Sequence, residues 1–202
     1  SSPSCGCGRT IGGDIHPRSR LRSLENLHLN NMDIVITYVN GLDPVWQAEY
    51  VKHTNTPILE KRFRDWGTLK YLFRGIEKNM PFIRKVHLVV SGESQVPEWV
   101  NRQEVNVVLH KDIIPQEYLP TFNCNPIEMH LHRIEGLDEE FLYFNDDMFP
   151  MKECKPTDFF RNGKGVIRVS YHLFAFDMFK QICRNSTRVA REALGLRQRL
   201  FF

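Results

Sequence analysis

Two adjacent carboxylates, Asp146 and Asp147, follow directly after the short apolar run 141–144. Such a run predicts a buried strand, so both carboxylates would stand at its carboxyl end. Mg²⁺ and Mn²⁺ bind a few carboxylate oxygens of this kind and complete their shells with diphosphate and water. The alternative is a solvated turn in which Asp146 caps the next element. An acidic doublet alone favours neither interpretation.

A polar turn also follows the β-branched run 33–39. Within it, Asn40-Gly41 permits a tight turn with positive φ, which would let the backbone approach a ligand closely. Asp43 lies just beyond, before Pro44. Without further context, Asp43 is better interpreted as a turn-capping residue than as a catalytic one.

Basic residues and one acid precede an apolar stripe that begins at Leu69. Arg64 could clamp a phosphate with two parallel hydrogen bonds, and a helix N-terminus would favour the same anion. In the alternative, Asp65 only caps the helix, with Thr68 three residues on, and the arginines are solvated. The residue types support both interpretations equally.

Charged and imidazole side chains lie on the segment after Pro126. Helical spacing places His130 and Arg133 on one face, whereas Glu128 and His132 share another. Either pair could meet a substrate, and a histidine could act as a general base. The spacing is not that of a zinc-binding helix, and a single helical histidine is more often packed or solvated.

These segments need a scaffold of alternating strands and helices. Apolar runs predict strands at 33–39, 86–90, 105–109, 141–144 and 166–169. Apolar stripes predict helices at 69–76, 126–136 and 174–194. This alternation indicates the α/β class, with a largely parallel sheet and flanking helices. Ligands of such sheets lie beyond the carboxyl ends of the strands, which selects the segments 40–43 and 145–147.

Composition limits the remaining possibilities. The chain has 202 residues, a length that favours one domain, and we expect an α/β catalytic domain at 32–202. Residues 1–31 are rich in Ser, Gly, Arg and Asn, so we expect them to form a flexible leader. A net charge of +3 is too small to indicate binding of nucleic acid. The five scattered cysteines form no disulfide pattern, which favours a reducing compartment. With neither a signal peptide nor an apolar run near the ~20 residues of a membrane span, we expect nothing in this chain to secrete or anchor it.

Taken together, these motifs resemble those of the Stealth family. The turn Tyr38-Val39-Asn40-Gly41-Leu42-Asp43 is similar to its first signature block, Trp/Tyr-Val-Asp/Asn-Gly-x-Asp. The longer second block is matched in order and spacing from Arg62 to Phe149. It includes His130-Leu131-His132-Arg133-Ile134-Glu135-Gly136 and Phe144-Asn145-Asp146-Asp147-Met148-Phe149. The resemblance covers roughly residues 32–160 and looks closer to the bacterial members.

The resemblance implies a GT-A-like enzyme that transfers a hexose-1-phosphate, commonly GlcNAc-1-phosphate. The donor would be a UDP-sugar, the acceptor a glycan hydroxyl, and the metal Mg²⁺ or Mn²⁺. It implies catalytic roles for Asp43, Asp65 and His130, and metal binding by Asp146 and Asp147. We also expect substrate contacts from Asn40, Gly41, Arg64, Arg133 and Asn145. Such an enzyme would serve capsular or exopolysaccharide synthesis in the cytoplasm, associated with the inner face of the bacterial membrane.

Members of the family usually carry third and fourth blocks downstream, whereas this chain ends at Phe202, soon after its second block. We therefore expect a domain truncated on its C-terminal side, which holds the donor-and-metal half of the site. Two alternatives stay open. One is an ordinary GT-A-type glycosyltransferase, which would release UDP rather than UMP, and the other is a non-catalytic family member.

Overall fold

The computed structural model describes residues 32–166, 178–193 and 195. They fall into two compact units, one ending at Gly165 and one beginning at Val166, where the sequence predicts a single domain across 32–202. The expected leader at 1–31 lies outside the described residues. All the site residues expected from the sequence belong to the first unit.

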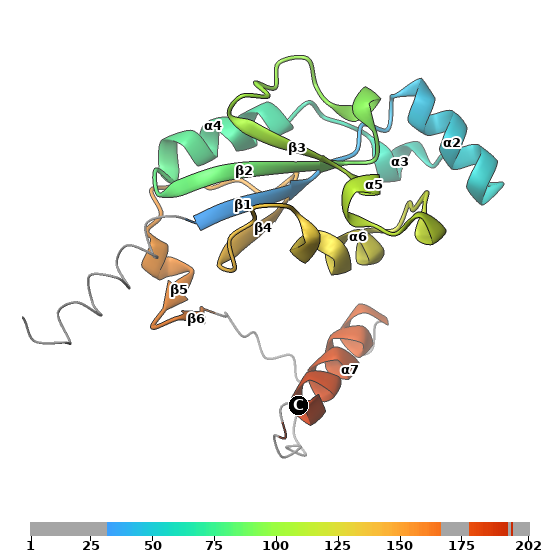
Figure 1. The fold of residues 1–202 in the computed structure, drawn as a ribbon. Coiled ribbons are helices and arrows are strands. Elements are labelled where there is room, and N and C mark those ends of the chain that lie inside the picture. Colours follow the sequence, from blue (N-terminus) through green and yellow to red (C-terminus); the bar gives the residue numbers. More distant parts are fainter. Residues whose placement is uncertain (1–31, 167–177, 194, 196–202) are drawn as a thin grey trace, which may run out of the picture. The chain divides into compact units, whose positions relative to one another are not determined.

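A four-stranded parallel sheet forms the centre of the first unit (Figure 1). Its strands are β1 (Met32–Thr37), β2 (Ile83–Val90), β3 (Val105–Leu109) and β4 (Phe141–Asn145). Their order is β3-β2-β1-β4, so β1 lies between β2 and β4. All three pairings are parallel. The predicted α/β class is therefore confirmed, and the arrangement is consistent with the GT-A-like fold that the resemblance implies.

Helices connect these strands and cover both faces of the sheet. They are α2 (Pro44–Thr54), α3 (Glu60–Phe63), α4 (Leu69–Asn79), α5 (His110–Ile113) and α6 (Cys124–His130). Short 3₁₀ turns are η1 (Glu93–Gln95), η2 (Gln116–Tyr118), η3 (Leu131–Arg133) and η4 (Pro156–Asp158). A small antiparallel hairpin of β5 (Phe160–Arg161) and β6 (Lys164–Gly165) ends the unit.

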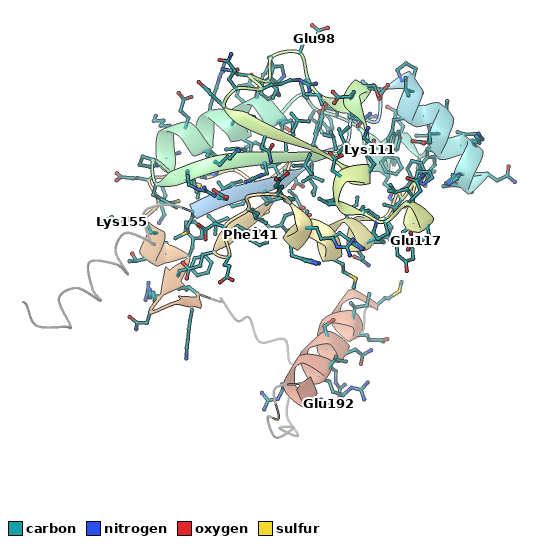
Figure 2. The ribbon with its side chains drawn as sticks, in the orientation of Figure 1. Glu98, Lys111, Glu117, Phe141, Lys155 and Glu192 are labelled. Atoms are coloured by element: carbon teal, nitrogen blue, oxygen red, sulfur yellow. The ribbon has the colours of Figure 1, made fainter. Side chains whose placement is uncertain are left out.

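The alternation of side chains along the strands divides the core between the two faces of the sheet. Ile36 of β1 points to the face that α4 covers, where Leu72 is fully buried. Val35 points to the opposite face and packs there with Ile113 of α5. Charged side chains such as Glu98, Lys111 and Glu117 point away from this core (Figure 2). Removal of apolar side chains from water on both faces thus holds the helices against the sheet.

Among the described helices, α2, α3, α5 and α6 begin where the sequence pattern does not predict them. α6 starts at Cys124 rather than near Pro126, because the Asn123 side chain accepts a hydrogen bond from a backbone amide of the first turn. α2 has no counterpart among the predicted helices. Only Trp46 and Tyr50 of its residues are buried, so its sequence shows no apolar stripe.

The second unit contains α7 (Met178–Ala193). This helix agrees with the predicted helix 174–194 over the described residues. Residues 167–169 of the predicted strand 166–169 lie outside the described part of the chain. In the parts that the structure describes, no helix is both long enough and apolar enough to cross a membrane.

A buried network of charged and polar groups fastens the amino end of the sheet. Asp33 on β1 is fully buried and accepts two hydrogen bonds from the Arg84 guanidinium of β2, at 3.0 and 2.6 Å. His87 of β2 lies 3.2 Å from the same carboxylate, and Asn106 of β3 donates to its other ring nitrogen at 2.9 Å. Burial alone would raise the pKa of Asp33, but bonds from Arg84, the Asp138 amide and His87 hold it below its ordinary value. The network therefore joins three neighbouring strands.

Replacement of Asp33 by Asn tests this network. At neutral pH we expect Asp33→Asn to lower the free energy of unfolding by about 2 kcal/mol, because an amide donor would then face the donors of Arg84 and His87. The folded-state pKa of Asp33 is lowered, so its contribution is complete above the ordinary carboxyl pKa and is lost as the pH falls through the lowered value.

Denaturant unfolding is measured from neutral to acidic pH. The free energies of unfolding of the variant and the native chain should therefore become equal as the pH falls. The exposed Glu139→Gln removes one negative charge at a residue outside the network and is the matched control. Equal unfolding free energies of Asp33→Asn and the native chain at neutral pH would contradict the assignment.

Candidate active site

The carboxyl ends of the parallel strands meet at one edge of the sheet. Thr37, the last residue of β1, pairs with Val89 of β2 and with Asn145, the last residue of β4. The turns that follow β1, β2 and β4 therefore adjoin, although they are far apart in the sequence. This is the edge at which ligands bind in open parallel sheets.

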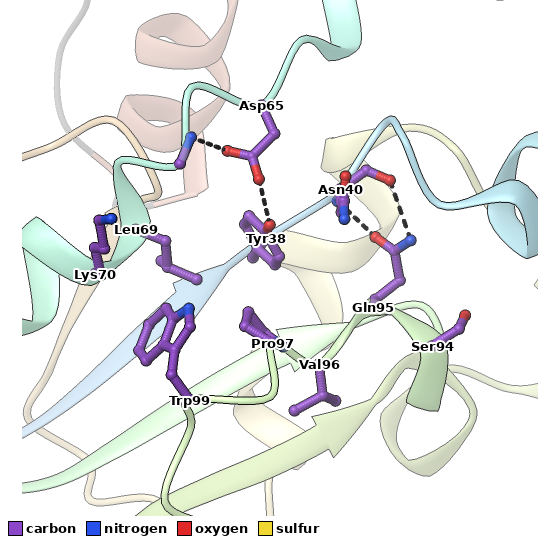
Figure 3. A pocket seen from close by; sticks show the side chains of 11 residues that line it. Tyr38, Asn40, Asp65, Leu69, Lys70, Ser94, Gln95, Val96, Pro97 and Trp99 are labelled. Atoms are coloured by element: carbon purple, nitrogen blue, oxygen red, sulfur yellow. Dashed lines mark hydrogen bonds between the residues drawn. The ribbon is translucent and has the colours of Figure 1, made fainter.

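A small polar pocket of about 200 Å³ lies between the turns after β1 and β2 (Figure 3). Its lining includes Tyr38, Asn40, Asp65, Lys70, Gln95 and Trp99. Sites that enclose a whole drug-sized ligand measure roughly 300–1,000 Å³, so this pocket suits one part of a larger ligand.

Tyr38 stands at the centre of the pocket and binds Asp65. Its hydroxyl donates to Oδ2 of Asp65 at 2.7 Å, and Oδ1 accepts from the Gly67 amide at 2.7 Å. Burial raises the pKa of Tyr38, and the charges of Asp65 and Asp146 raise it further, so the hydroxyl stays protonated. The alternative interpretation, in which Asp65 caps α4, is wrong because the N-cap is Thr68. Asp65 instead lines the pocket.

Asp146 and Asp147 bring two further carboxylates to this edge. The pKa of Asp146 is raised above its ordinary value, first by burial and then by the negative charges of Asp147 and Asp65. Among the described residues, no positively charged side chain contributes to this shift in the pKa of Asp146. Among the described residues, no three acidic, histidine or cysteine side chains form a ready metal site. Carboxylate oxygens are ligands that Mg²⁺ and Mn²⁺ prefer, together with phosphate and water.

The turn after β1 has a different backbone from the expected one. Neither Asn40 nor Gly41 has a positive φ, so the expectation of a left-handed turn is wrong. A Cβ atom on Gly41 would lie 1.9 Å from the carbonyl oxygen of Phe63 and 2.6 Å from its Cβ. Glycine is required here because the backbone of Phe63, rather than a ligand, passes directly against it.

Asp43 is buried at the start of α2, with 6% of its surface exposed, and is the N-cap of that helix. Its Oδ1 accepts from the Val45 amide at 2.9 Å. Its Oδ2 accepts from the Ser94 hydroxyl and the Gln95 side-chain amide, both at 2.6 Å. Burial alone would raise the pKa of Asp43, but these bonds hold it below its ordinary value. This geometry favours the capping interpretation of Asp43 over a catalytic one.

The two arginines expected to contact substrate interact elsewhere. Arg64 forms an ion pair with Glu60 and lies over the Trp66 ring, 5.3 Å from its centroid. It follows α3 as the C-cap and is not part of a helix N-terminus. Arg133 donates to the Ile113 carbonyl oxygen at 3.4 Å. Among the described residues, Lys70 is the cation that lines the polar pocket.

A second polar cluster surrounds Tyr143, which packs toward the opposite face of the sheet. The Tyr143 hydroxyl lies 3.0 Å from Thr37 Oγ1, 3.1 Å from Glu128 Oε1 and 2.9 Å from Asn145 Oδ1. Burial raises the pKa of Tyr143 to about 12; the bond from Thr37 opposes this rise and Glu128 adds to it. The cluster therefore brings Glu128 to the end of β4, beside the expected substrate contact Asn145.

His130 ends α6 with a defined arrangement of its ring nitrogens. Its Nδ1 lies 2.7 Å from the Pro126 carbonyl oxygen, so Nδ1 carries the proton and donates it. In the neutral form of this ring Nε2 would carry the lone pair, which is the group that a general base requires.

Sequence inspection does not single out Tyr38, Ser94, Gln95 or Tyr143 as parts of the site. Ser94 and Gln95 lie in the turn after β2. The rule that ligands bind beyond the carboxyl ends of strands applies to that turn as well, so it could have found both residues. Tyr38 is part of the signature block after β1, but its bond to Asp65 does not follow from that pattern. No local pattern marks Tyr143, whose bonds to Thr37 and Glu128 join segments distant in the sequence.

The fold and the edge define a class: an α/β protein with an open parallel sheet, whose polar and acidic edge lies beyond the carboxyl ends of the strands, where such sheets bind ligands. Residues 62–167 match the family model described as Stealth protein CR2, conserved region 2. The match covers more than half of the chain, so the chain belongs to the Stealth family.

Three relatives are polysaccharide phosphotransferases by name. WefC of Streptococcus oralis, a receptor polysaccharide phosphotransferase, is 45% identical over 141 residues, which cover 65% of this chain and 42% of WefC. WcwK of Streptococcus pneumoniae, a capsular polysaccharide phosphotransferase, is 41% identical with the same coverage of 65% and 42%. CpsJ of Streptococcus thermophilus, also capsular, is 39% identical over 78% of this chain and 70% of CpsJ. The chain thus spans about two fifths of WefC and WcwK.

Substitution of Gly41 tests the close packing of the turn. We expect Gly41→Ala to lower the free energy of unfolding by about 1–3 kcal/mol, because the new methyl group would overlap the Phe63 backbone. Gly92→Ala is the matched control, since a Cβ there meets nothing within 4 Å and its φ of −165° is extended. Thermal and denaturant unfolding measure both variants. If Gly41→Ala were as stable as Gly92→Ala, the turn would accommodate the added methyl group at little cost, which would contradict the prediction.

Proposed function

We propose that this chain transfers a hexose-1-phosphate, most simply GlcNAc-1-phosphate, from a UDP-sugar to a glycan hydroxyl in capsular or exopolysaccharide synthesis. The observation that carries the proposal is the gathering of Asp65, Asp146 and Asp147 beside a polar pocket in a Stealth-family chain. Relatives named polysaccharide phosphotransferases support the reaction class. A UDP-sugar donor would place the activity in the cytoplasm, and a membrane-bound glycan acceptor would bring it to the inner face of the membrane.

The donor would lie along the carboxyl edge of the sheet. Its diphosphate would face Asp146 and Asp147, which would hold Mg²⁺ or Mn²⁺; when bound, the cation neutralises phosphate charge. Lys70 would pair with a donor phosphate from the pocket wall. The protonated Tyr38 hydroxyl keeps one Asp65 oxygen occupied and so fixes the direction of the carboxylate.

In the proposed reaction the acceptor hydroxyl oxygen attacks the phosphorus atom that bears the sugar. A new P–O bond forms, the bond from that phosphorus to the bridging oxygen breaks, and UMP leaves with the electron pair. The hydroxyl proton passes to a base, for which Nε2 of His130 is the candidate. The sugar C1–O bond stays intact, so the anomeric configuration is retained.

The released nucleotide tests this reaction directly. The chain is incubated with UDP-GlcNAc, Mn²⁺ and an oligosaccharide acceptor, and the nucleotides are separated by ion-exchange chromatography. We expect UMP, and we expect Asp147→Ala to slow its release by at least about 100-fold through loss of a cation ligand. Glu135→Ala, an exposed acid on a different turn, is the control.

The other possible results of the nucleotide assay distinguish the alternative functions. Release of UDP would identify an ordinary glycosyltransferase, and release of neither nucleotide by a folded chain would identify a non-catalytic family member. Undiminished UMP release by Asp147→Ala would contradict the metal assignment while leaving the reaction class in place.

A stability measurement tests the same carboxylates without turnover. The pKa of Asp146 is raised in the folded chain, so its ionised form destabilises the metal-free protein. We expect Asp146→Asn to unfold at a higher temperature than the native chain without metal. This difference should be complete above the raised pKa and should disappear as the pH falls to the ordinary carboxyl value.

Added Mn²⁺ should reverse the comparison. It should raise the unfolding temperature of the native chain, because binding to the folded state adds stability. It should leave Asp146→Asn unchanged. Equal Mn²⁺-induced shifts in both proteins would exclude Asp146 as a ligand.

A further inference from the structure

Gln95 joins two turns that lie 55 residues apart in the sequence. It ends η1 and is buried, with only 2% of its surface exposed. Its Oε1 accepts from the Asn40 backbone amide at 2.6 Å. Its Nε2 donates to the Asn40 carbonyl oxygen at 3.2 Å and to Oδ2 of Asp43 at 2.6 Å. Figure 3 shows the paired bonds to Asn40 at the wall of the pocket.

These bonds fix both backbone polar groups of Asn40. Its carbonyl oxygen also accepts from the Asp43 amide at 3.2 Å, and its side-chain Oδ1 accepts from the Leu42 amide at 2.9 Å. The side-chain Nδ2 is therefore the group that Asn40 can offer to a ligand in the pocket that it lines. The direction of this donor depends on the backbone that Gln95 holds.

The side-chain amide of Gln95 has no hydrogen left to donate to a ligand. Both of its amide hydrogens are donated, and its oxygen accepts from Asn40. Asp43 is the titratable group in contact with it, while Asp65 and Lys70 line the same pocket. Glu93, at the start of η1, forms an ion pair with Arg102.

We propose that Gln95 is a positioning residue for donor binding, which presents Asn40 to the nucleotide-sugar in one orientation. The proposal rests on the proposed function, since the ligand is the UDP-sugar donor. A residue with this role acts on the donor through Asn40.

The isosteric variant Gln95→Glu provides the test. Its new carboxyl oxygen would replace Nε2, close to Oδ2 of Asp43, and two carboxylates at hydrogen-bond distance cannot both be ionised without a large cost. At low pH the introduced carboxyl group is protonated and can still donate to Asp43, so the contact is kept. As the pH rises, the pair loses its proton, the carboxylates repel, and the turn that carries Asn40 is displaced.

The affinity for UDP-GlcNAc in Mn²⁺ is measured by calorimetry for the native chain and the variant, and circular dichroism follows folding. The ratio of the two dissociation constants should stay near one at about pH 5.5 and should rise by about tenfold or more by about pH 8.5. Gln103→Glu adds the same charge at an exposed residue and should keep a ratio of one throughout. Gln95→Leu removes the side-chain bonds without a charge, so it should weaken binding equally at every pH.

The outcomes separate this proposal from the proposed function. A native chain that binds no UDP-GlcNAc would overturn the proposed function. A native chain that binds it, with a flat ratio for Gln95→Glu, would overturn the positioning role alone. If Gln95→Glu unfolds as the pH rises, the affinity of Gln95→Leu for UDP-GlcNAc is the deciding measurement. A folded Gln95→Leu that binds UDP-GlcNAc as tightly as the native chain would also overturn the positioning role.

Discussion

The parallel pairing of β1 with both of its neighbours is the constraint on which the rest of the structure depends. Because Thr37 is opposite Val89 on one side and Asn145 on the other, three distant turns end at the same edge. A slip of one residue would move Asp146 away from the turn after β1. The same slip would turn Ile36 out of the core, since neighbouring strand residues face opposite ways. One register therefore fixes both the packing and the site.

Among the described residues, negative charge is compensated by a neighbouring cation at one end of the sheet and is not at the other. At the amino end, the Asp33 carboxylate is matched by Arg84 and the pKa of Asp33 is lowered. At the carboxyl end, the pKa of Asp146 is raised by burial and by the neighbouring acids Asp147 and Asp65. The first arrangement stabilises the folded chain, whereas the second costs stability while no cation compensates the charge. That contrast supports the proposal that the carboxyl end is the functional one.

The strands and the acidic pair could be predicted because local sequence determines them. Apolar runs identify each strand of the parallel sheet, and the rule about carboxyl ends then locates Asp146. The remaining features depend on contacts between segments far apart in the chain. The need for glycine at residue 41 comes from the backbone of Phe63, and the backbone of Asn40 is held by Gln95. No periodicity or spacing within one segment contains that information.

Asp43 and Asp65 show how geometry separates a positioning carboxylate from one that can bind a ligand. By type and place in the sequence, both are acids in a turn before a helix. Asp43 is buried and its oxygens accept from a backbone amide and two side chains, so its charge is already balanced by protein donors. Asp65 is less buried and, among the described residues, accepts from Tyr38 and the Gly67 amide, which leaves lone pairs in the pocket. The unfilled acceptor positions of Asp65, together with the unbalanced charge around Asp146, are therefore the features on which the proposed binding of a cation and its phosphate depends.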